Sequence, residues 1–171
     1  DGSGGLVTRF SREARFSFFA YWPVAVDADG DGDMDLAGAS TLPGFVTVTF
    51  NRGGGNFEGS ISAPVPLDPA EVSAGDLDFD GDQDLAIGCW GSYEGVSILI
   101  NNGGGTFAAP VDYDAGTGPM AIVAVDLNGD GDPDLAVANN DSDDISVLLN
   151  NGDGTFAAAV NYTTGTGPHS A

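Results

Sequence analysis

Short apolar segments alternate with turns rich in Gly, Asn and Asp along most of this chain. In its C-terminal third the apolar segments are residues 123–126, 135–138, 145–149 and, less cleanly, 155–162. Short apolar and β-branched runs bounded by such turn residues are typical of β-strands. The pattern therefore predicts four short strands in this part of the chain and an all-β protein.

This pattern repeats with a period of about 50 residues. Three segments align without gaps: "VAVDADGDGDMDLAGAS" (24–40), "SAGDLDFDGDQDLAIGC" (73–89) and "VAVDLNGDGDPDLAVAN" (123–139). A glycine-rich turn follows each of them at nearly the same spacing: "NRGGGNF" (51–57), "NNGGGTF" (101–107) and "NNGDGTF" (150–156). Asn and Gly tolerate the positive φ angles of tight hairpins, so each turn is expected to join two strands.

Four strands in each repeat of this length indicate a β-propeller blade, whereas the turns of a linear β-solenoid are usually much shorter. We expect an all-β fold, a β-propeller segment over residues 1–171 built from four-stranded antiparallel blades. The expected repeat units are 7–55, 56–105, 106–154 and a partial fourth unit, 155–171. Propellers close with about 4–8 blades. The chain is therefore expected to be either a fragment of a longer propeller or an open one that self-assembles.

Each repeat contains an acidic loop, with Gly32, Gly81 or Gly131 at its sixth position. Oxygen-bearing side chains stand at positions one, three, five, seven and nine: Asp27, Asp29, Asp31, Asp33 and Asp35; Asp76, Asp78, Asp80, Asp82 and Asp84; Asp126, Asn128, Asp130, Asp132 and Asp134. Two unit charges ~5 Å apart repel by about 0.8 kcal/mol even in water, and a divalent cation reverses this effect. The same run could form an ordinary solvated turn, but three copies in register favour a metal.

Calcium suits these loops because it accepts several oxygen ligands in irregular geometry, and the glycine permits the sharp turn. No His or Cys stands nearby in the loops, which argues against zinc and copper. We expect about three Ca²⁺ ions, one per complete loop, with position seven contributing its backbone carbonyl. Asn128 gives the third loop one charge fewer and a weaker site. An EF-hand is excluded, because position twelve is Gly38, Ile87 or Val137 instead of Glu.

Charge and composition narrow the range of functions. The chain has 26 Asp and Glu against 4 Lys and Arg, a formal net charge of −22, which argues against nucleic-acid partners. No long apolar run is present, so no membrane insertion is expected. No enzyme is expected either, because His169 is the one histidine and no nucleophile–base pair stands out. The lone Cys89 is expected to be a small buried hydrophobe.

The loop pattern D-x-[DN]-x-D-G-x-x-D-L-A at 27–37, 76–86 and 126–136, with the N-x-G-x-G-x-F turns and the Gly-Pro at 118–119, resembles the FG-GAP repeat. This family includes the VCBS-like and integrin α-subunit-type repeats. The resemblance implies a calcium-stabilised β-propeller, usually seven-bladed, with the ion held between the first two strands of each blade. It also implies ligands at positions one, three, five, seven and nine.

By the same resemblance, the protein is expected to be a secreted or cell-surface recognition or adhesion module with structural calcium. Its expected partner is a protein or glycan on the extracellular side, with homo-oligomers or further blades closing the propeller. One alternative is a lectin-like propeller, for which Trp22, Trp90 and Tyr93 are the candidate sugar-stacking residues. Others are the propeller part of a secreted polysaccharide-active enzyme, and a spacer. The aromatic and basic stretch 9–22 is either an atypical outer strand or a recognition patch.

Overall fold

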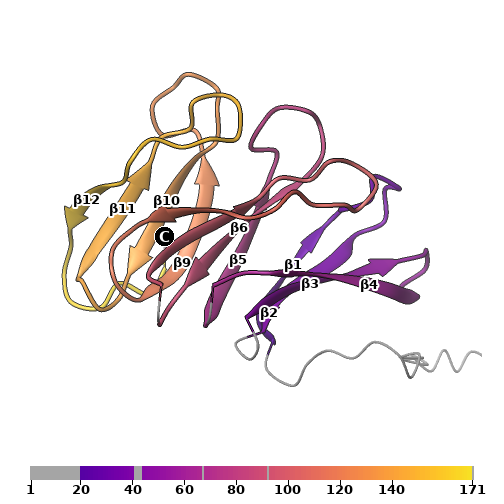
Figure 1. Cartoon of the computed structure of the whole chain (residues 1–171). Coiled ribbons are helices and arrows are strands. Elements are labelled where there is room, and N and C mark those ends of the chain that lie inside the picture. The colour runs from indigo at the N-terminus through magenta and orange to yellow at the C-terminus, as the bar shows by residue number, and fades with distance from the viewer. Residues whose placement is uncertain (1–19, 41–43, 67, 92, 171) are drawn as a thin grey trace, which may run out of the picture.

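The structure is a computed structural model that describes residues 20–40, 44–66, 68–91 and 93–170. Within this part of the chain every regular element is a β-strand, and the strands form three separate four-stranded antiparallel sheets (Figure 1). No helix among these residues has the length and apolarity needed to cross a membrane. The predicted all-β class and the four-stranded antiparallel blade are confirmed.

Each sheet follows the chain as a meander, so that consecutive strands are neighbours. The first sheet contains β1 (Ala20–Val26), β2 (Asp35–Ser40), β3 (Phe45–Asn51) and β4 (Phe57–Pro64). The second contains β5 (Pro69–Gly75), β6 (Asp84–Cys89), β7 (Gly95–Leu99) and β8 (Val111–Asp114). The third contains β9 (Pro119–Val125), β10 (Asp134–Asn139), β11 (Asp144–Leu148) and β12 (Val160–Thr163).

The last strand of the third sheet differs from the apolar segment expected at 155–162. After β11 the chain makes a single bridge, Asn150 to Phe156, and the N–H of Ala157 donates to the carbonyl of Leu149 at 2.8 Å. Regular pairing resumes only at Val160, which faces Val147 of β11. The stretch 155–171, expected to open a fourth unit, therefore supplies the outer strand β12 to the third sheet.

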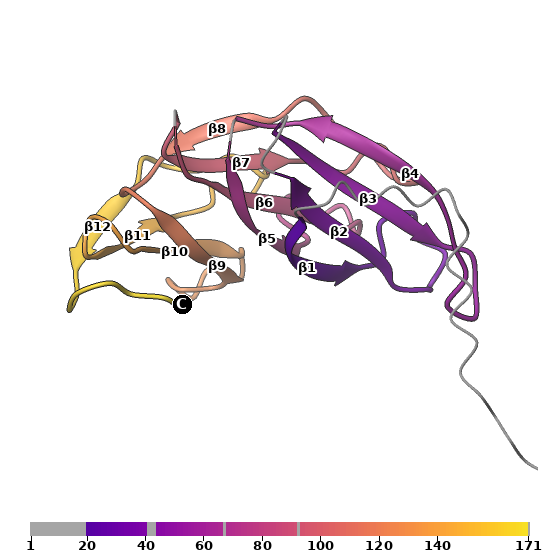
Figure 2. The same ribbon diagram turned by 90° about the horizontal axis from the view of Figure 1, so that it is seen from below.

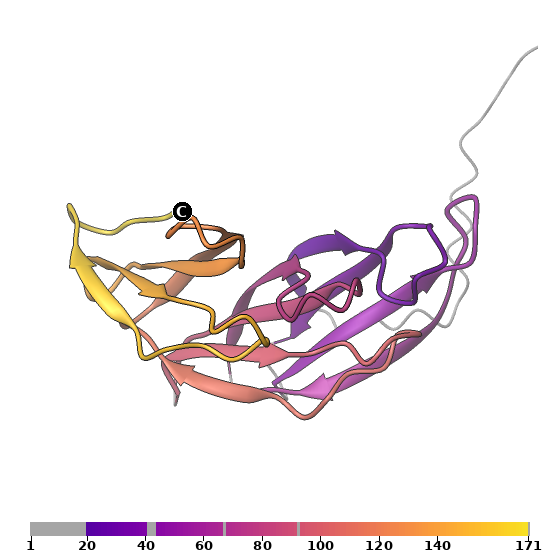
Figure 3. The ribbon, with the colours of Figure 1, turned by 90° about the horizontal axis from the view of Figure 1, so that it is seen from above.

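The three sheets stand side by side as blades of an open propeller. The first strand of each sheet lies next to the first strand of its neighbour, β1 beside β5 and β5 beside β9. Figure 2 shows these strands on the concave side of an arc, with β4 and β8 along the convex side. Seen from above, the sheets succeed one another around the arc and do not close into a ring (Figure 3).

Two apolar cores fill the spaces between neighbouring sheets. The first joins residues of the first sheet, such as Val48, to residues of the second, such as Leu85 and Ile87. The second core joins the second sheet, through Val96 and Ile98, to the third sheet. Cys89 is fully buried in the first core, as expected of a small hydrophobe. Because the cores lie between the sheets, adjacent blades stabilise one another.

Of the stretch 9–22, residues 9–19 lie outside the described part of the chain. Residues 20–22 belong to the backbone of β1, which pairs with β2. The two interpretations of that stretch stay open.

Candidate metal centres

The acidic loops join the first two strands of each blade, as the sequence resemblance implies. In the first blade the loop begins after Val26 of β1 and ends at Asp35, the first residue of β2, and these two residues pair across the hairpin. The same register is found between Gly75 and Asp84 and between Val125 and Asp134. Position nine is therefore a strand residue, and its side chain lies at the base of the loop.

The position-nine carboxylates are fully buried and hold the loop closed. Asp35 accepts hydrogen bonds from the backbone N–H of Ala28 at 3.0 Å and of Asn51 at 2.7 Å, one on each oxygen. The other two blades repeat these bonds: Leu77 and Asn101 to Asp84, both at 2.7 Å, and Leu127 and Asn150 to Asp134, at 3.0 and 2.8 Å. Each carboxylate thus joins the acidic loop to the turn that follows the third strand.

Side chains earlier in the loop curl its backbone. Asp27, at position one, accepts hydrogen bonds from the N–H groups of Gly30 and Gly32 at 3.0 and 3.1 Å. Asp31, at position five, accepts one from the N–H of Asp33 at 2.9 Å. The sixth position adopts φ angles of 89°, 96° and 100° in the three loops. These positive angles favour glycine, which is the role predicted for it.

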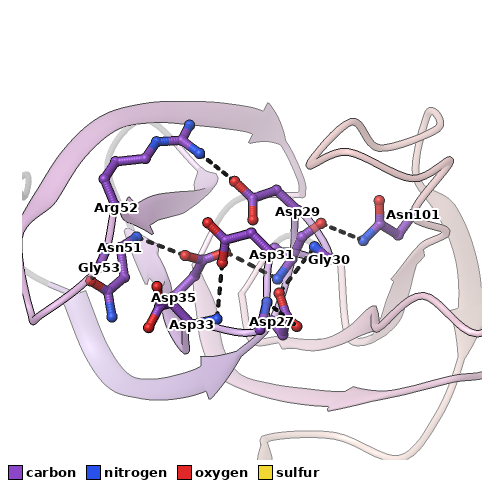
Figure 4. Close-up of polar contacts among 12 residues, drawn as sticks. Asp27, Asp29, Gly30, Asp31, Asp33, Asp35, Asn51, Arg52, Gly53 and Asn101 are labelled. Carbon is purple, nitrogen blue, oxygen red and sulfur yellow. Dashed lines mark hydrogen bonds and ion pairs between the residues drawn. The ribbon is translucent and has the colours of Figure 1, made fainter.

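Carboxylate oxygens from positions one, three and nine converge in the first two loops. One oxygen each from Asp27, Asp29 and Asp35 lie within 4.8 Å of one another, and so do one each from Asp76, Asp78 and Asp84. Figure 4 shows the first of these groups. Each group draws on a strand end and two loop positions, so it depends on the hairpin being closed.

The donor chemistry fits a hard cation. Among the described side chains, Asp29 Oδ1 and Asp76 Oδ1 are buried and have no hydrogen-bond partner, and each belongs to one of the two groups. A buried carboxylate oxygen without a partner is costly, and an oxygen-seeking divalent cation would supply that partner. Each of the two groups therefore has oxygen ligands that suit a hard cation, and one buried oxygen that such an ion would partner.

The third loop has the same shape with a different position three. The amide nitrogen of Asn128 donates to Asp130 Oδ2, and its amide oxygen accepts from the N–H of Asp130, both at 2.8 Å. Asp126 accepts from two loop glycines as Asp27 does. Because this loop has an amide where the others have a carboxylate, its charge density is lower.

Positions five and seven are not members of the two converging groups. Asp31, Asp80 and Asp130 are exposed. The carboxylate of Asp132, at position seven, points to the turn after β11: a Cβ on Gly152 would lie 2.8 Å from its Oδ2. The assignment of all fifteen loop residues as ligands stays a prediction.

Burial and mutual repulsion raise the proton affinity of several loop carboxylates. Burial, with a smaller contribution from neighbouring carboxylates, raises the pKa of Asp84 to about 6 and also raises the pKa of Asp35 and of Asp78. A neutral carboxyl at these positions would relieve the repulsion, and so would a bound cation.

Two contributors were not predicted from the sequence. Arg52 forms an ion pair with Asp29 Oδ2 and lies over the Phe50 ring at 4.9 Å, so it neutralises part of the first loop. The asparagine that opens each glycine-rich turn contacts the loops directly, as described for Asn51 and Asn101. The sequence contains a signal that could have identified this asparagine, because it recurs at the first position of all three turns.

Comparisons with known proteins agree with this architecture. The family model of the FG-GAP-like repeat matches three overlapping stretches, 27–87, 80–137 and 126–171. No match was found among curated protein sequences.

Solved structures include similar proteins. One is a lectin of Agrocybe aegerita that specifically recognises non-reducing terminal N-acetylglucosamine. It is 24% identical, with a TM-score of 0.57 over 84% of this chain and 38% of the lectin chain. Another is the Tc holotoxin pore of Photorhabdus luminescens, 21% identical, with a TM-score of 0.47 over 82% of this chain and 7% of that one. The chain spans less than half the length of either, and the likeness to the lectin shows a shared fold.

Proposed function

Because the chain belongs to the FG-GAP-like repeat family, we propose that it is a calcium-stabilised recognition module, secreted or displayed at a cell surface. It binds a protein or glycan ligand and does not catalyse a reaction. The observation that carries the calcium assignment is the pair of buried, unpartnered oxygens of Asp29 and Asp76 within converging carboxylate groups.

Calcium has a structural role in this proposal. The residues that would hold it are those at positions one, three and nine of the first two loops. When bound, the ion supplies positive charge that cancels carboxylate repulsion. The chain's own part is to close each hairpin, because Asp35 and Asp84 already tie the loop to the turn after the third strand.

An extracellular location suits these sites. Loop aspartates at position five are exposed, so the loops are open to calcium from the surrounding medium. Extracellular calcium, at millimolar concentration, would fill them, whereas cytosolic calcium would not.

A non-catalytic role is supported by the chemistry of the described nucleophile candidates. The thiol of Cys89 is buried, and burial raises its pKa to about 11, so it is not ionised at neutral pH. His169 is exposed, and its Nδ1 lies 3.3 Å from the Asn140 side-chain amide, without a nucleophile as its partner.

Thermal unfolding with and without calcium tests this function. EDTA is expected to lower the melting temperature, and added Ca²⁺ to restore it, with Mg²⁺ less effective. An unchanged melting curve would refute the calcium assignment.

A glycan ligand is the second candidate, favoured by one feature of the edge opposite the acidic loops. Trp90, in the β6–β7 loop, is 43% exposed, and its backbone N–H donates to the carbonyl of Asp68 at 2.8 Å. An exposed aromatic ring suits sugar binding, because the ring stacks on the sugar's apolar face. Titration with N-acetylglucosamine and a glycan array, with Trp90→Ala as the comparison, would test it.

A further inference from the structure

Asn101 links the acidic loops of two neighbouring blades. In its own blade its backbone N–H donates to Asp84 Oδ1 at 2.7 Å, and its side-chain amide donates to the carbonyl of Gln83 at 3.1 Å. The same amide also donates to the carbonyl of Ala28 in the preceding blade at 2.9 Å (Figure 4). An Asn side chain has two N–H donors, so both are used, one in each loop.

Asn150 repeats this arrangement one blade further along the chain. Its backbone N–H donates to Asp134, and its amide donates to the carbonyl of Pro133 at 3.1 Å and to that of Leu77 at 2.8 Å. Both asparagines are almost fully buried, with 1% and 5% of their surface exposed. The three acidic loops are thus connected in series through two buried side chains.

The turn that carries each asparagine also packs on the preceding loop. A Cβ on Gly105 would lie 2.6 Å from the Phe50 ring and 3.4 Å from the Cβ of Asp29. A Cβ on Gly154 would lie 3.0 Å from the Cβ of Asp78. In both cases the contact is with the position-three aspartate of the preceding blade, so the turn forms one wall of that blade's candidate metal site.

The first blade contains a natural control. Asn51 makes the bonds within its own blade, to Asp35 at 2.7 Å and to the carbonyl of Met34 at 3.2 Å, but it contacts no other acidic loop among the described residues. Gly55 has a φ of 76°, against 75° for Gly105, and no atom of the described residues lies within 4 Å of a Cβ built on it. Equivalent substitutions in the two turns therefore differ mainly in the contact between blades.

We propose that Asn101 and Asn150 are positioning residues that couple the calcium sites of neighbouring blades, so that an ion in one loop raises the affinity of the preceding loop. The proposal rests on the calcium function proposed above. An ion in the second loop fixes Asp84, which holds Asn101, and Asn101 holds Ala28 between two ligands of the first loop. By linkage, an ion in the first loop favours binding in the second by the same factor.

Isothermal titration with Ca²⁺ tests the coupling in a thermodynamic cycle. All proteins carry Asp126→Ala to remove the third site, and Asp76→Ala then disables the second. In the protein that keeps Asn101, Asp76→Ala is expected to weaken Ca²⁺ binding at the first loop about fivefold or more. In the Asn101→Ala background the factor should fall close to one, whereas in the Asn51→Ala background it should persist.

A second measurement does not need bound calcium. In EDTA, Gly105→Ala and Asn101→Ala are expected to lower the melting temperature more than Gly55→Ala and Asn51→Ala, because only the former pair disturbs a contact between blades. Equal losses would refute the role of the turn as a wall of the preceding site.

The outcomes separate the two proposals. If the wild-type chain takes up no Ca²⁺ in the titration, the proposed function is wrong, and the coupling fails with it. If it binds Ca²⁺ but Asp76→Ala leaves the first loop's affinity unchanged, the calcium function survives and only the coupling is overturned.

Discussion

At the scale of single residues, Phe79 has a positive φ angle at the fourth position of the second acidic loop, where the other two loops have glycine. Its φ is 62°, and its equivalents are Gly30 and Gly129, with φ of 75° and 85°. The side chain is 53% exposed, so packing does not compensate for the strain. Left-handed backbone costs an L-residue about 1–2 kcal/mol relative to glycine, partly offset by the entropy of glycine in the unfolded chain.

We therefore expect Phe79→Gly to be about 1 kcal/mol more stable than Phe79→Ala. The two variants lose the same aromatic side chain and differ in their freedom at positive φ. Chemical denaturation at saturating calcium measures the difference. A Phe79→Gly protein no more stable than Phe79→Ala would mean that the loop relaxes to another conformation.

Asp84 gives the calcium-free protein a distinctive response to pH. Burial raises its pKa from 3.8 to about 6 in the folded protein, so the folded state binds the proton more tightly than the unfolded state. The stability contributed by this proton is complete below about pH 3.8 and is lost as the pH rises through about 6. In EDTA, lowering the pH from 7 to 5 should raise the melting temperature.

Calcium should reverse the sign of this response, because protons then compete with the ion for the same carboxylates. Melting curves at pH 5 and 7, in EDTA and in Ca²⁺, give the comparison. Asp84→Asn removes one titrating group and should flatten the response in EDTA. A melting temperature that falls with acidification in both buffers would contradict the assignment.

At the scale of elements, the hairpin between the first two strands of each blade is a closed unit, and the position-nine aspartate closes it. Asp134 is fully buried and accepts hydrogen bonds from the backbone N–H groups of Leu127 and Asn150. Hydrogen bonds to charged groups contribute about 1.5–3 kcal/mol each, and their loss leaves buried donors unpaired. This role does not require a metal.

Asp134→Ala is accordingly expected to lower the free energy of unfolding by about 3 kcal/mol or more, even in EDTA. Asp130→Ala is the matched control in the same loop, because Asp130 is exposed; it should change stability by about 0.5 kcal/mol or less. Urea denaturation in EDTA measures both. Similar values for the two variants would show that Asp134 acts only through a bound ion.

The sequence predicted the hairpins well because their information is local. Asp27 and Asp35 are close along the chain, and the repeat places each loop between two apolar runs. The start of β12 was not predicted, since the turn after β11 continues as a single bridge before the strand resumes. Asn101 and Ala28 are 73 residues apart in the sequence. A pattern of neighbouring residues therefore does not predict their contact.

At the scale of the whole molecule, repeated positions have different environments in different blades. The second loop position is Ala28, Leu77 or Leu127, and these residues are 1%, 1% and 47% exposed. The first two are covered by the next blade, whereas Leu127 has no such neighbour among the described residues. The period predicts the blade, but the environment of a residue depends on which blade stands beside it.

Calcium should act on the molecule through these shared boundaries and not only inside single loops. A ligand present at 100 times its dissociation constant stabilises the folded state by about 2.7 kcal/mol per independent site. Two loops bring three carboxylates together each, so calcium is expected to add about 5 kcal/mol when both are filled to that degree. Asp76→Ala should remove half of this gain if the sites are independent, and more than half if Asn101 couples them.

Differential scanning calorimetry over a calcium series distinguishes the two cases, with Asp130→Ala as the control expected to retain most of the gain. A loss of less than half would mean that the ion bound in the second loop contributes less than its neighbour, against the equivalence of the two carboxylate groups.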